Sequence, residues 1–385
     1  QIFFDLDNNH FAELTGWVDR NDGLLVLDRN KNGKIDNGSE LFGNHTELVD
    51  GSKAANGFDA LREFDSNQDG KLDHNDVIWQ ELQVWQDFNR DGKANSGELK
   101  SLNELGIKEI NLDYQNINHT DSANNIHKQR STVVWEDGRT TDITDVWFQT
   151  DSARTRSTSN IEIPDDLYLL PNIYAFGNVL DLREAMTLDD ELRNMIETYL
   201  SSPDNQSEEA LYTIIYRWTG SEEIDPYSRD PKKVYNHVMD ARQLVSLENL
   251  TGSGYLGTWC WGELDPNPHG RAAPLLIAEF KKFADYVNAN LLSFTNEHFQ
   301  TYYDKDLKIR KYDWSVLNTH LEELLKEDNR EEIYYIAKIA RDLGTYSSEY
   351  RLKWSQYLLG LRENNLALYQ VVDSKVIKGS DGNDY

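Results

Sequence analysis

The spacing of hydrophobic residues changes near residue 150 and divides the chain into two parts. In the first part, IKEINLDYQ (107–115) and STVVWEDGRTTDITDVWFQ (131–149) alternate apolar and polar residues, which predicts strands. Asp137–Gly138 supplies a turn in the second run, and GWVDRNDGLLVLD predicts another hairpin around Asp22–Gly23. Residues 116–130 are polar and predict a loop. Residues 75–86 predict a short helix, because four apolar residues there follow helical spacing: Val77, Ile78, Leu82 and Trp85.

From residue 161 onward, apolar residues recur every three or four positions, which is typical of amphipathic helices. SEEALYTIIYRW (207–218), PLLIAEFKKFADYVNANLL (274–292) and three segments between residues 317 and 363 show this pattern. Two of these helices are predicted to end at Gly344 and Gly360. The short connections between them favour antiparallel neighbours, and hence a helical bundle.

The candidate chemistry lies in the first part, where oxygen-bearing side chains recur at alternate positions. Residues 87–98, named loop C here, match the calcium-loop pattern D-x-[DN]-x-[DN]-G-x5-E. Glycine at position 6 allows a sharp turn, position 7 binds through its main-chain carbonyl, and a carboxylate at position 12 can bind through both oxygens. A surface turn rich in Asp and Asn is the alternative. The predicted ligands are Asp87, Asn89, Asp91, Lys93, Asn95 and Glu98.

Two upstream segments repeat this pattern with small changes. Residues 65–76, loop B, end in an aspartate, which is shorter than glutamate and predicts weaker binding. Residues 28–40, loop A, place the closing glutamate one position late, which predicts a widened loop. The predicted ligands are Asp65, Asn67, Asp69, Lys71, Asp73 and Asp76 in loop B, and Asp28, Asn30, Asn32, Lys34, Asp36 and Glu40 in loop A.

Two weaker matches lie at the ends of the chain. Residues 5–16, loop D, have Asp5, Asp7 and Asn9 in place, but His10 stands where glycine is expected and position 12 has no carboxylate. The sequence thus predicts three calcium sites and leaves a fourth open. At the other end, IKGSDGNDY fits the opening of a calcium-binding RTX nonapeptide repeat, although a Gly-Asp turn would look the same. Because one repeat cannot bury its own face, we expect the chain to be cut from a longer protein.

Composition agrees with a calcium-binding chain and excludes several classes of function. The chain has 67 acidic and 39 basic residues and a net charge of −28, so we expect no nucleic-acid partner and repulsion from anionic membranes. No long apolar run predicts a membrane span. The histidines lack zinc-site spacing, and no phosphate-binding glycine motif occurs. A single cysteine, Cys260, excludes an internal disulfide framework, and we expect a buried thiol packed between aromatic residues rather than a catalytic nucleophile.

These features together predict an α+β protein. An EF-hand-like calcium-loop module with short strands and helices is expected over residues 1–150. The small, polar residues 151–160 are expected to form a linker, and a mostly α-helical bundle domain should follow over residues 161–374. Residues 375–385 would begin the RTX repeat.

The segments TGWVDRNDGLLVLDRNKNGKIDNGSELFGNHTEL and VWQDFNRDGKANSGELKSLNELGIKEINLDY resemble the self-processing module of secreted RTX proteins, the Frp-type iron-regulated proteins and the ApxIV-type toxins. The resemblance covers residues 1–150, and the helical part looks like the region preceding RTX repeats. It implies a bacterial virulence protein exported by type I secretion. It also implies a module that calcium folds, that cleaves an Asp-Pro bond just upstream, and that joins the new aspartyl end to a lysine of a protein.

The sequence departs from the family pattern at its beginning. The family's module starts with proline and a further acidic stretch, whereas this chain starts inside that stretch, so we expect the scissile bond to be missing or already cut. The chain's own Asp-Pro pairs begin at Asp225, Asp230 and Asp265, and all three predict turns in the helical part. No catalytic residue is therefore assigned. The alternative hypothesis is a non-enzymatic part of an RTX exoprotein, in which calcium only stabilises the fold and the helical domain binds a partner.

Overall fold

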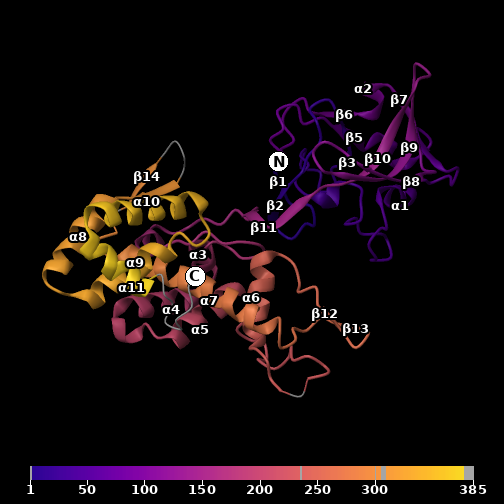
Figure 1. Cartoon of the computed structure of the whole chain (residues 1–385). Coiled ribbons are helices and arrows are strands. Elements are labelled where there is room, and N and C mark those ends of the chain that lie inside the picture. Colours follow the sequence, from indigo (N-terminus) through magenta and orange to yellow (C-terminus); the bar gives the residue numbers. More distant parts are fainter. Residues whose placement is uncertain (1, 235, 300, 305–308, 377–385) are drawn as a thin grey trace. The chain divides into compact units, whose positions relative to one another are not determined.

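Figure 1 shows the computed structural model, which describes residues 2–234, 236–299, 301–304 and 309–376. The chain divides into two compact units. Unit 1 comprises Gln1–Asn160, Phe176–Asn178 and Thr251–Ser253, and unit 2 comprises Ile161–Ala175, Val179–Leu250 and Gly254–Tyr385. Unit 1 consists mainly of strands and loops and unit 2 mainly of helices, which confirms the predicted α+β class with a helical C-terminal part. The predicted RTX segment lies, from residue 377 onward, outside the described residues.

The first sheet of unit 1 has the order β1 (Ile2–Phe4), β2 (Phe11–Thr15), β11 (Thr150–Ser157), with antiparallel pairing. The prediction of a linker over residues 151–160 is therefore wrong for most of that stretch. Its side chains are polar because β11 pairs with β2 mainly through backbone groups and leaves most side chains partly exposed. Composition alone could not reveal that pairing.

A second antiparallel sheet corrects two further predictions. Its order is β3 (Leu24–Leu27), β5 (Leu82–Trp85), β6 (Leu99–Ser101). The turn before β3 is present, but β3 pairs with β5 rather than with residues 16–19, so the predicted hairpin is wrong. The predicted helix over residues 75–86 is only the 3-10 turn η2 (Val77–Gln80), and Val77 is exposed. The neighbouring strand β3 supplies hydrogen-bond partners that make residues 82–85 a strand.

The third sheet has the order β10 (Thr140–Trp147), β9 (Ile126–Trp135), β7 (Ile107–Asn111), β4 (Lys71–Asp73), and β8 (Gln115–Thr120) also pairs with β9. The strand near residue 107 and the hairpin around Asp137–Gly138 are thereby confirmed. The polar residues 116–130 are not a loop but form most of the β8–β9 hairpin, which has few buried side chains. Two helices, α1 (Gly57–Arg62) and α2 (Leu102–Leu105), and the 3-10 turn η1 (Gly38–Glu40) complete unit 1.

Two hydrophobic clusters lie among the described residues of unit 1, and residues of the candidate loops pack in them. One lies under the third sheet and includes Leu72 of β4, and the other joins β1 to the second sheet through Phe4, Trp17 and Trp85. Position 8 is buried in three loops, as Ile35, Leu72 and Ala12, with exposed fractions of 2%, 0% and 7%. Each of these loops is therefore fixed to the protein by an apolar side chain in its own second half.

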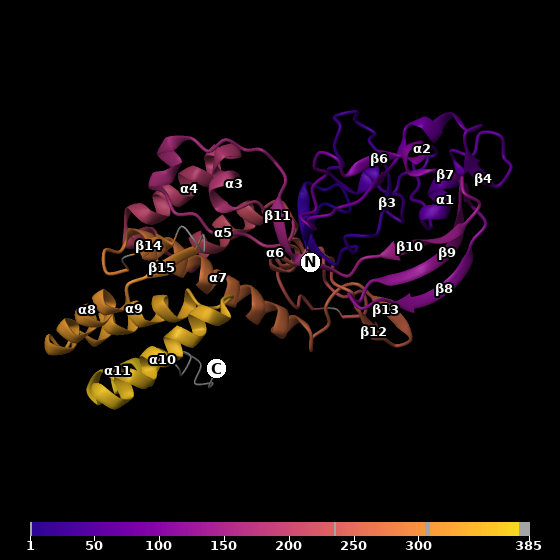
Figure 2. The ribbon, with the colours of Figure 1, turned by 90° about the horizontal axis from the view of Figure 1, so that it is seen from above.

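Unit 2 is built from amphipathic helices. The predicted helices correspond to α5 (Glu208–Thr219), α7 (Ala273–Thr295), α8 (Trp314–Lys326), α9 (Arg330–Asp342) and α10 (Ser348–Asn364). Figure 2 shows α8, α9 and α10 beside the last described helix, α11 (Leu366–Val376). The remaining helices are α3 (Leu182–Leu188), α4 (Asp190–Ser201) and α6 (Ala241–Thr251), with short turns η3 (Asp165–Leu169) and η4 (Pro203–Asn205) and the hairpins β12 (Thr258–Cys260)–β13 (Glu263–Asp265) and β14 (Thr301–Asp304)–β15 (Ile309–Tyr312).

Three features of unit 2 bear on predictions made from the sequence. Gly360 lies inside α10 rather than at a helix end, and α9 ends at Asp342, two residues before Gly344. Cys260 is only partly buried, and its neighbours Trp259 and Trp261 are each 75% exposed, so the thiol is not buried between these two rings as expected. In the part of the chain that the structure describes, the helices are too short or too polar to cross a membrane.

Candidate metal centres

All four candidate loops have left-handed backbone at the same two positions. Position 4 is left-handed in each, with φ of 58° at Asn8, Lys31 and Gln68 and 59° at Arg90. Position 6 is left-handed as well, with φ of 79°, 84° and 71° at the glycines of loops A, B and C. His10, at position 6 of loop D, adopts φ of 72° although it carries a Cβ. The histidine therefore replaces glycine without changing the turn.

The first aspartate organises each loop by the same pair of hydrogen bonds. Its two carboxylate oxygens accept the backbone N–H groups of positions 5 and 6. In loop C these distances to Asp87 are 3.1 and 2.9 Å, and in loop D the distances to Asp5 are both 3.0 Å. Asp28 and Asp65 accept the corresponding bonds at 2.7–3.2 Å. The repeated pattern bends the main chain around the carboxylate and places the side chains of positions 1, 3 and 5 together.

The closing carboxylates of loops A, B and C are buried, and each accepts hydrogen bonds from backbone N–H groups of its own loop. Glu98 accepts N–H groups from positions 2 and 9 of loop C, at 3.1 and 2.9 Å. Asp76 does the same in loop B, at 2.8 and 2.9 Å. Glu40 accepts the N–H of Asp36 at 2.7 Å. Glu40 lies one position later than the motif prescribes, and the turn η1 places its carboxylate against loop A.

Glu40 also provides a test of whether a cation fits. Its side chain is 1% exposed, and its Oε1 has no hydrogen-bond partner. Burial and the neighbouring carboxylates of Asp36 and Asp28 raise the pKa of Glu40. A buried carboxylate oxygen without a donor is costly unless a cation or proton satisfies it. The donor set around it is oxygen only, which suits calcium better than zinc.

Loop D contains a carboxylate that the sequence pattern missed. Glu13, at position 9 on strand β2, accepts the N–H of position 2, Leu6, at 3.2 Å, as the closing carboxylates do in loops B and C. Ligand atoms of Asp5, Asp7 and Glu13 lie within 4.8 Å of one another, close enough to hold a metal ion. Burial, followed by the nearby charges of Asp7 and Asp5, raises the pKa of Glu13 to about 7. The available signal was a charged residue in the otherwise uncharged strand FAELT.

The remaining predicted residues lie on the loops with differing exposure. In loops A, B and C, positions 3 and 5 are solvent-exposed and accept the N–H groups of positions 5 and 7, for example Asn89 Oδ1 from Asp91 at 3.0 Å and Asp91 Oδ1 from Lys93 at 2.9 Å. Position 9 differs in loop B, because Lys71 Nζ lies 3.6 Å from Asp73 and 3.1 Å from Glu109. The ammonium group of Lys71 thus competes with a cation for the carboxylate of a predicted ligand, Asp73.

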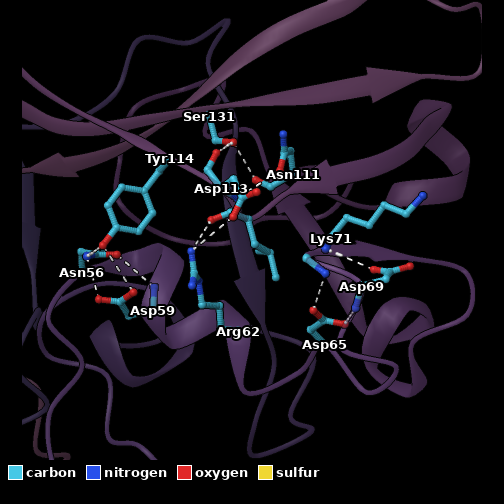
Figure 3. A network of polar contacts seen from close by, with 12 residues as sticks. Asn56, Asp59, Arg62, Asp65, Asp69, Lys71, Asn111, Asp113, Tyr114 and Ser131 are labelled. Carbon is cyan, nitrogen blue, oxygen red and sulfur yellow. Dashed lines mark hydrogen bonds and ion pairs between the residues drawn. The ribbon is translucent and has the colours of Figure 1, made fainter.

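Loop B is also tied to the third sheet, as Figure 3 shows. The N–H of Leu112 donates to the Gly70 carbonyl at 3.0 Å, and the Arg62 guanidinium donates to the Leu112 carbonyl at 3.2 Å. The Ser131 hydroxyl reaches two carbonyls of the same segment, those of Asn111 and Asp113, at 2.8 and 2.7 Å. Loop B, which contains β4, is therefore fixed to β7 and to the segment 111–113, and that segment is held in turn by β9.

The three Asp-Pro pairs of the chain have ordinary structural roles. The Asp225 carboxylate accepts the N–H of Tyr227 at 3.0 Å, and Asp265 accepts the N–H groups of Lys232 and Asn267, both at 3.0 Å. Asp230 contacts the His237 imidazole at 2.9 Å. Each carboxylate is thus engaged in fixing a turn or a side chain of unit 2.

Comparison with known proteins agrees with this division of the chain. Residues 1–149 match the SPM domain family. The chain is 38% identical, over 216 residues, to the iron-regulated protein FrpA of Neisseria meningitidis serogroup C. The match covers 56% of this chain and 19% of the relative, so the chain spans only a fraction of that protein's length. The chain is thus related to the Frp-type iron-regulated proteins, and its likeness to the SPM domain coincides with the unit that carries the four loops.

Proposed function

We propose that residues 1–150 form a calcium-triggered module of a secreted RTX exoprotein, which cleaves an Asp-Pro bond on its N-terminal side and forms an Asp-Lys isopeptide link. The observation that carries this proposal is the repetition of one loop geometry four times around buried carboxylates. The similarity to the SPM domain family and to an iron-regulated Frp protein supports the same assignment.

Calcium would be held by the predicted residues of loops A, B and C, and by Asp5, Asp7 and Glu13 in loop D. Bound calcium would supply the positive charge that allows these clustered carboxylates to stay ionised while buried. The loops themselves contribute rigidity, because each first aspartate fixes two backbone N–H groups. Export from a compartment poor in calcium to one with millimolar calcium would couple the folding of unit 1 to secretion.

The proposed cleavage needs only the scissile aspartate and a proton donor. The aspartate carboxylate attacks its own peptide carbonyl carbon and forms a five-membered anhydride, while the protonated proline nitrogen leaves as an amine. Water then opens the anhydride to give a free carboxylate, or a lysine amine opens it to give the isopeptide bond. Unit 1 would hold the scissile segment in the reactive conformation and limit access of water.

The test extends this chain at its N-terminus with an Asp-Pro junction in its natural upstream context. Addition of calcium should release an N-terminal fragment, and mass spectrometry should detect that fragment joined to a lysine. The matched control carries Asn-Pro at the junction, which cannot form the anhydride. If the Asp-Pro chain remains intact at millimolar calcium, the enzymatic proposal is wrong.

A second candidate function is binding without catalysis. It is favoured by the β12–β13 hairpin of unit 2, where Trp259 and Trp261 are exposed. In this view the calcium loops only stabilise unit 1, and unit 2 contacts a partner. The two functions differ in one checkable feature, because only the first requires an Asp-Pro pair directly upstream of residue 1 in the full-length gene.

A further inference from the structure

We propose that loop C controls the position of strand β1 through Trp17 and Gly92, and thereby transmits calcium binding to the peptide that precedes the module. The inference rests on the proposed function, because β1 is the strand that leads to that peptide. It assigns a positioning role to residues that are not metal ligands.

The first contact is a hydrogen bond from a buried indole to the loop. Trp17 Nε1 donates to Asp87 Oδ2 at 2.7 Å, and the same oxygen accepts the Gly92 N–H at 2.9 Å. Trp85 Nε1 lies 3.4 Å from Glu98 Oε2. Both the first and the closing carboxylate of loop C are therefore bound by indoles. Among the described residues, no indole donates to the corresponding groups of loops A, B and D.

The same indoles hold strand β1. The ring of Phe4 lies 5.3 Å from Trp17 and 5.9 Å from Trp85, centroid to centroid, and all three side chains are nearly inaccessible to solvent. Trp17 also stacks on Phe148 at 5.3 Å. A change in the carboxylates of loop C would therefore displace rings that pack directly on β1.

The second contact is steric and involves the turn glycine of the loop. A Cβ at Gly92 would lie 2.3 Å from Ile2 Cδ1 and 3.3 Å from the Phe3 carbonyl oxygen. The equivalent glycines of loops A and B, Gly33 and Gly70, have open space at that position. All three have positive φ, so an alanine costs similar backbone strain at each, but only at position 92 would it strike β1.

Strand β1 is also surrounded by two of the other loops. Loop D begins where β1 ends, and the Asp5 carbonyl accepts the Gly38 N–H of loop A at 2.7 Å. Loop B instead belongs to the cluster under the third sheet. Loops A, C and D thus border β1, whereas loop B serves as an internal control.

The experiment uses amide hydrogen exchange across β1 and β2 in the chain extended upstream, with and without calcium. Calcium should slow exchange at residues 2–4. Gly92→Ala should raise the calcium concentration required for this protection by about tenfold or more, whereas Gly70→Ala should leave protection of β1 near that of the wild type. Adding Ile2→Val to Gly92→Ala removes Cδ1, the nearest clashing atom, and should restore most of the protection.

The indole contact is tested by Trp17→Phe, which removes the N–H and keeps an aromatic ring. The matched control is Trp79→Phe, because Trp79 is equally buried in the other cluster and donates to Asn103 rather than to a loop carboxylate. We expect Trp17→Phe, and not Trp79→Phe, to weaken the calcium-dependent protection of β1 by about tenfold.

The outcomes separate this inference from the proposed function. Equal effects of the Gly92 and Gly70 variants, or of the two tryptophan variants, would overturn the inference even if the wild-type chain cleaves itself. Protection of β1 that depends on Gly92 and Trp17 in a chain that never cleaves would support the coupling and contradict the proposed reaction.

Discussion

At the scale of single residues, the candidate loops combine buried carboxylates with strained backbone. Position 4 of each loop is left-handed although it carries a side chain, and His10 is left-handed at position 6 of loop D. Such conformations cost on the order of 1–2 kcal/mol per residue and persist only where the surroundings enforce them. In loop D the Asp5 carboxylate stabilises the left-handed conformation of His10 by accepting its N–H.

His10→Gly should raise the stability of unit 1. The His10 side chain is exposed, so glycine loses little contact and removes the left-handed strain. We expect a gain of about 0.5–1 kcal/mol in the free energy of unfolding, measured by urea denaturation. The same change at His74, which is exposed but has negative φ, should instead lower stability slightly. A destabilised His10→Gly protein would show that the imidazole has a role beyond the turn.

Glu40→Gln should change stability in opposite directions with and without calcium. Without calcium, the neutral amide removes a buried charge whose Oε1 has no donor, so the variant should be more stable by about 1–3 kcal/mol. With calcium, the variant should gain less stability than the wild type, because it lacks a charged ligand. Thermal unfolding in chelator and in calcium measures both effects. Glu47→Gln, at an exposed glutamate nearby, should change neither.

At the scale of elements, unit 2 depends on junctions between helices. Asp189 caps α4 by accepting the N–H groups of Glu191 and Leu192, and it binds the Arg217 guanidinium of α5 through two hydrogen bonds of 2.7 and 2.9 Å. Hydrogen bonding to Arg217 holds the pKa of Asp189 below its ordinary value. One carboxylate therefore both caps the N-terminus of α4 and joins that helix to α5.

Two substitutions at this position should separate its roles. Asp189→Asn keeps a good cap and loses the ion pair, so it should cost about 1 kcal/mol, whereas Asp189→Ala should cost about 2 kcal/mol. Because the folded-state pKa is lowered, the stability from ionisation is present above the unfolded pKa of about 3.9 and is lost as the pH falls through the lower folded value. The wild type and Asp189→Asn should therefore converge in acid, as followed by circular dichroism. A wild-type protein that kept its stability advantage over Asp189→Asn in acid would contradict this role of the ionised carboxylate.

At the scale of the whole molecule, the two units should respond differently to calcium. The chain has 28 more negative than positive charges, and the candidate ligands of unit 1 concentrate many of them in four short segments. The helices of unit 2 instead bury apolar side chains such as Phe280 and Ile336. Calcium should therefore stabilise unit 1 alone.

Removal of calcium should produce two separate unfolding transitions. The transition of unit 1 should move to lower temperature, while that of unit 2 stays in place and preserves most of the helical signal. At a calcium concentration 100-fold above the dissociation constant, each site would contribute about 2.7 kcal/mol. Calorimetry with chelator, calcium or magnesium measures this effect. A single unfolding transition whose midpoint temperature does not depend on calcium would contradict the proposed coupling of metal binding to folding.

The sequence by itself determined the features whose causes are local. The spacing of aspartate, asparagine and glycine defines loops A, B and C, because each loop is closed by hydrogen bonds within a dozen residues. The amphipathic repeats of α5 and α7 likewise predict helices, since a helix makes its backbone bonds within one segment. The turn at Asp137–Gly138 is also predictable from the sequence, because its cause is local.

Tertiary structure decided the features that depend on a distant partner. Residues 150–157 and 82–85 are strands rather than the predicted linker and helix, because β2 pairs with the first segment and β3 and β6 pair with the second. Glu13 closes loop D from a strand, outside the position that the motif prescribes, and Trp17 reaches Asp87 across 70 residues. A sequence records which residues can bind or pair, but folding brings the partners together, and so the arrangement around β1 emerges only from the fold.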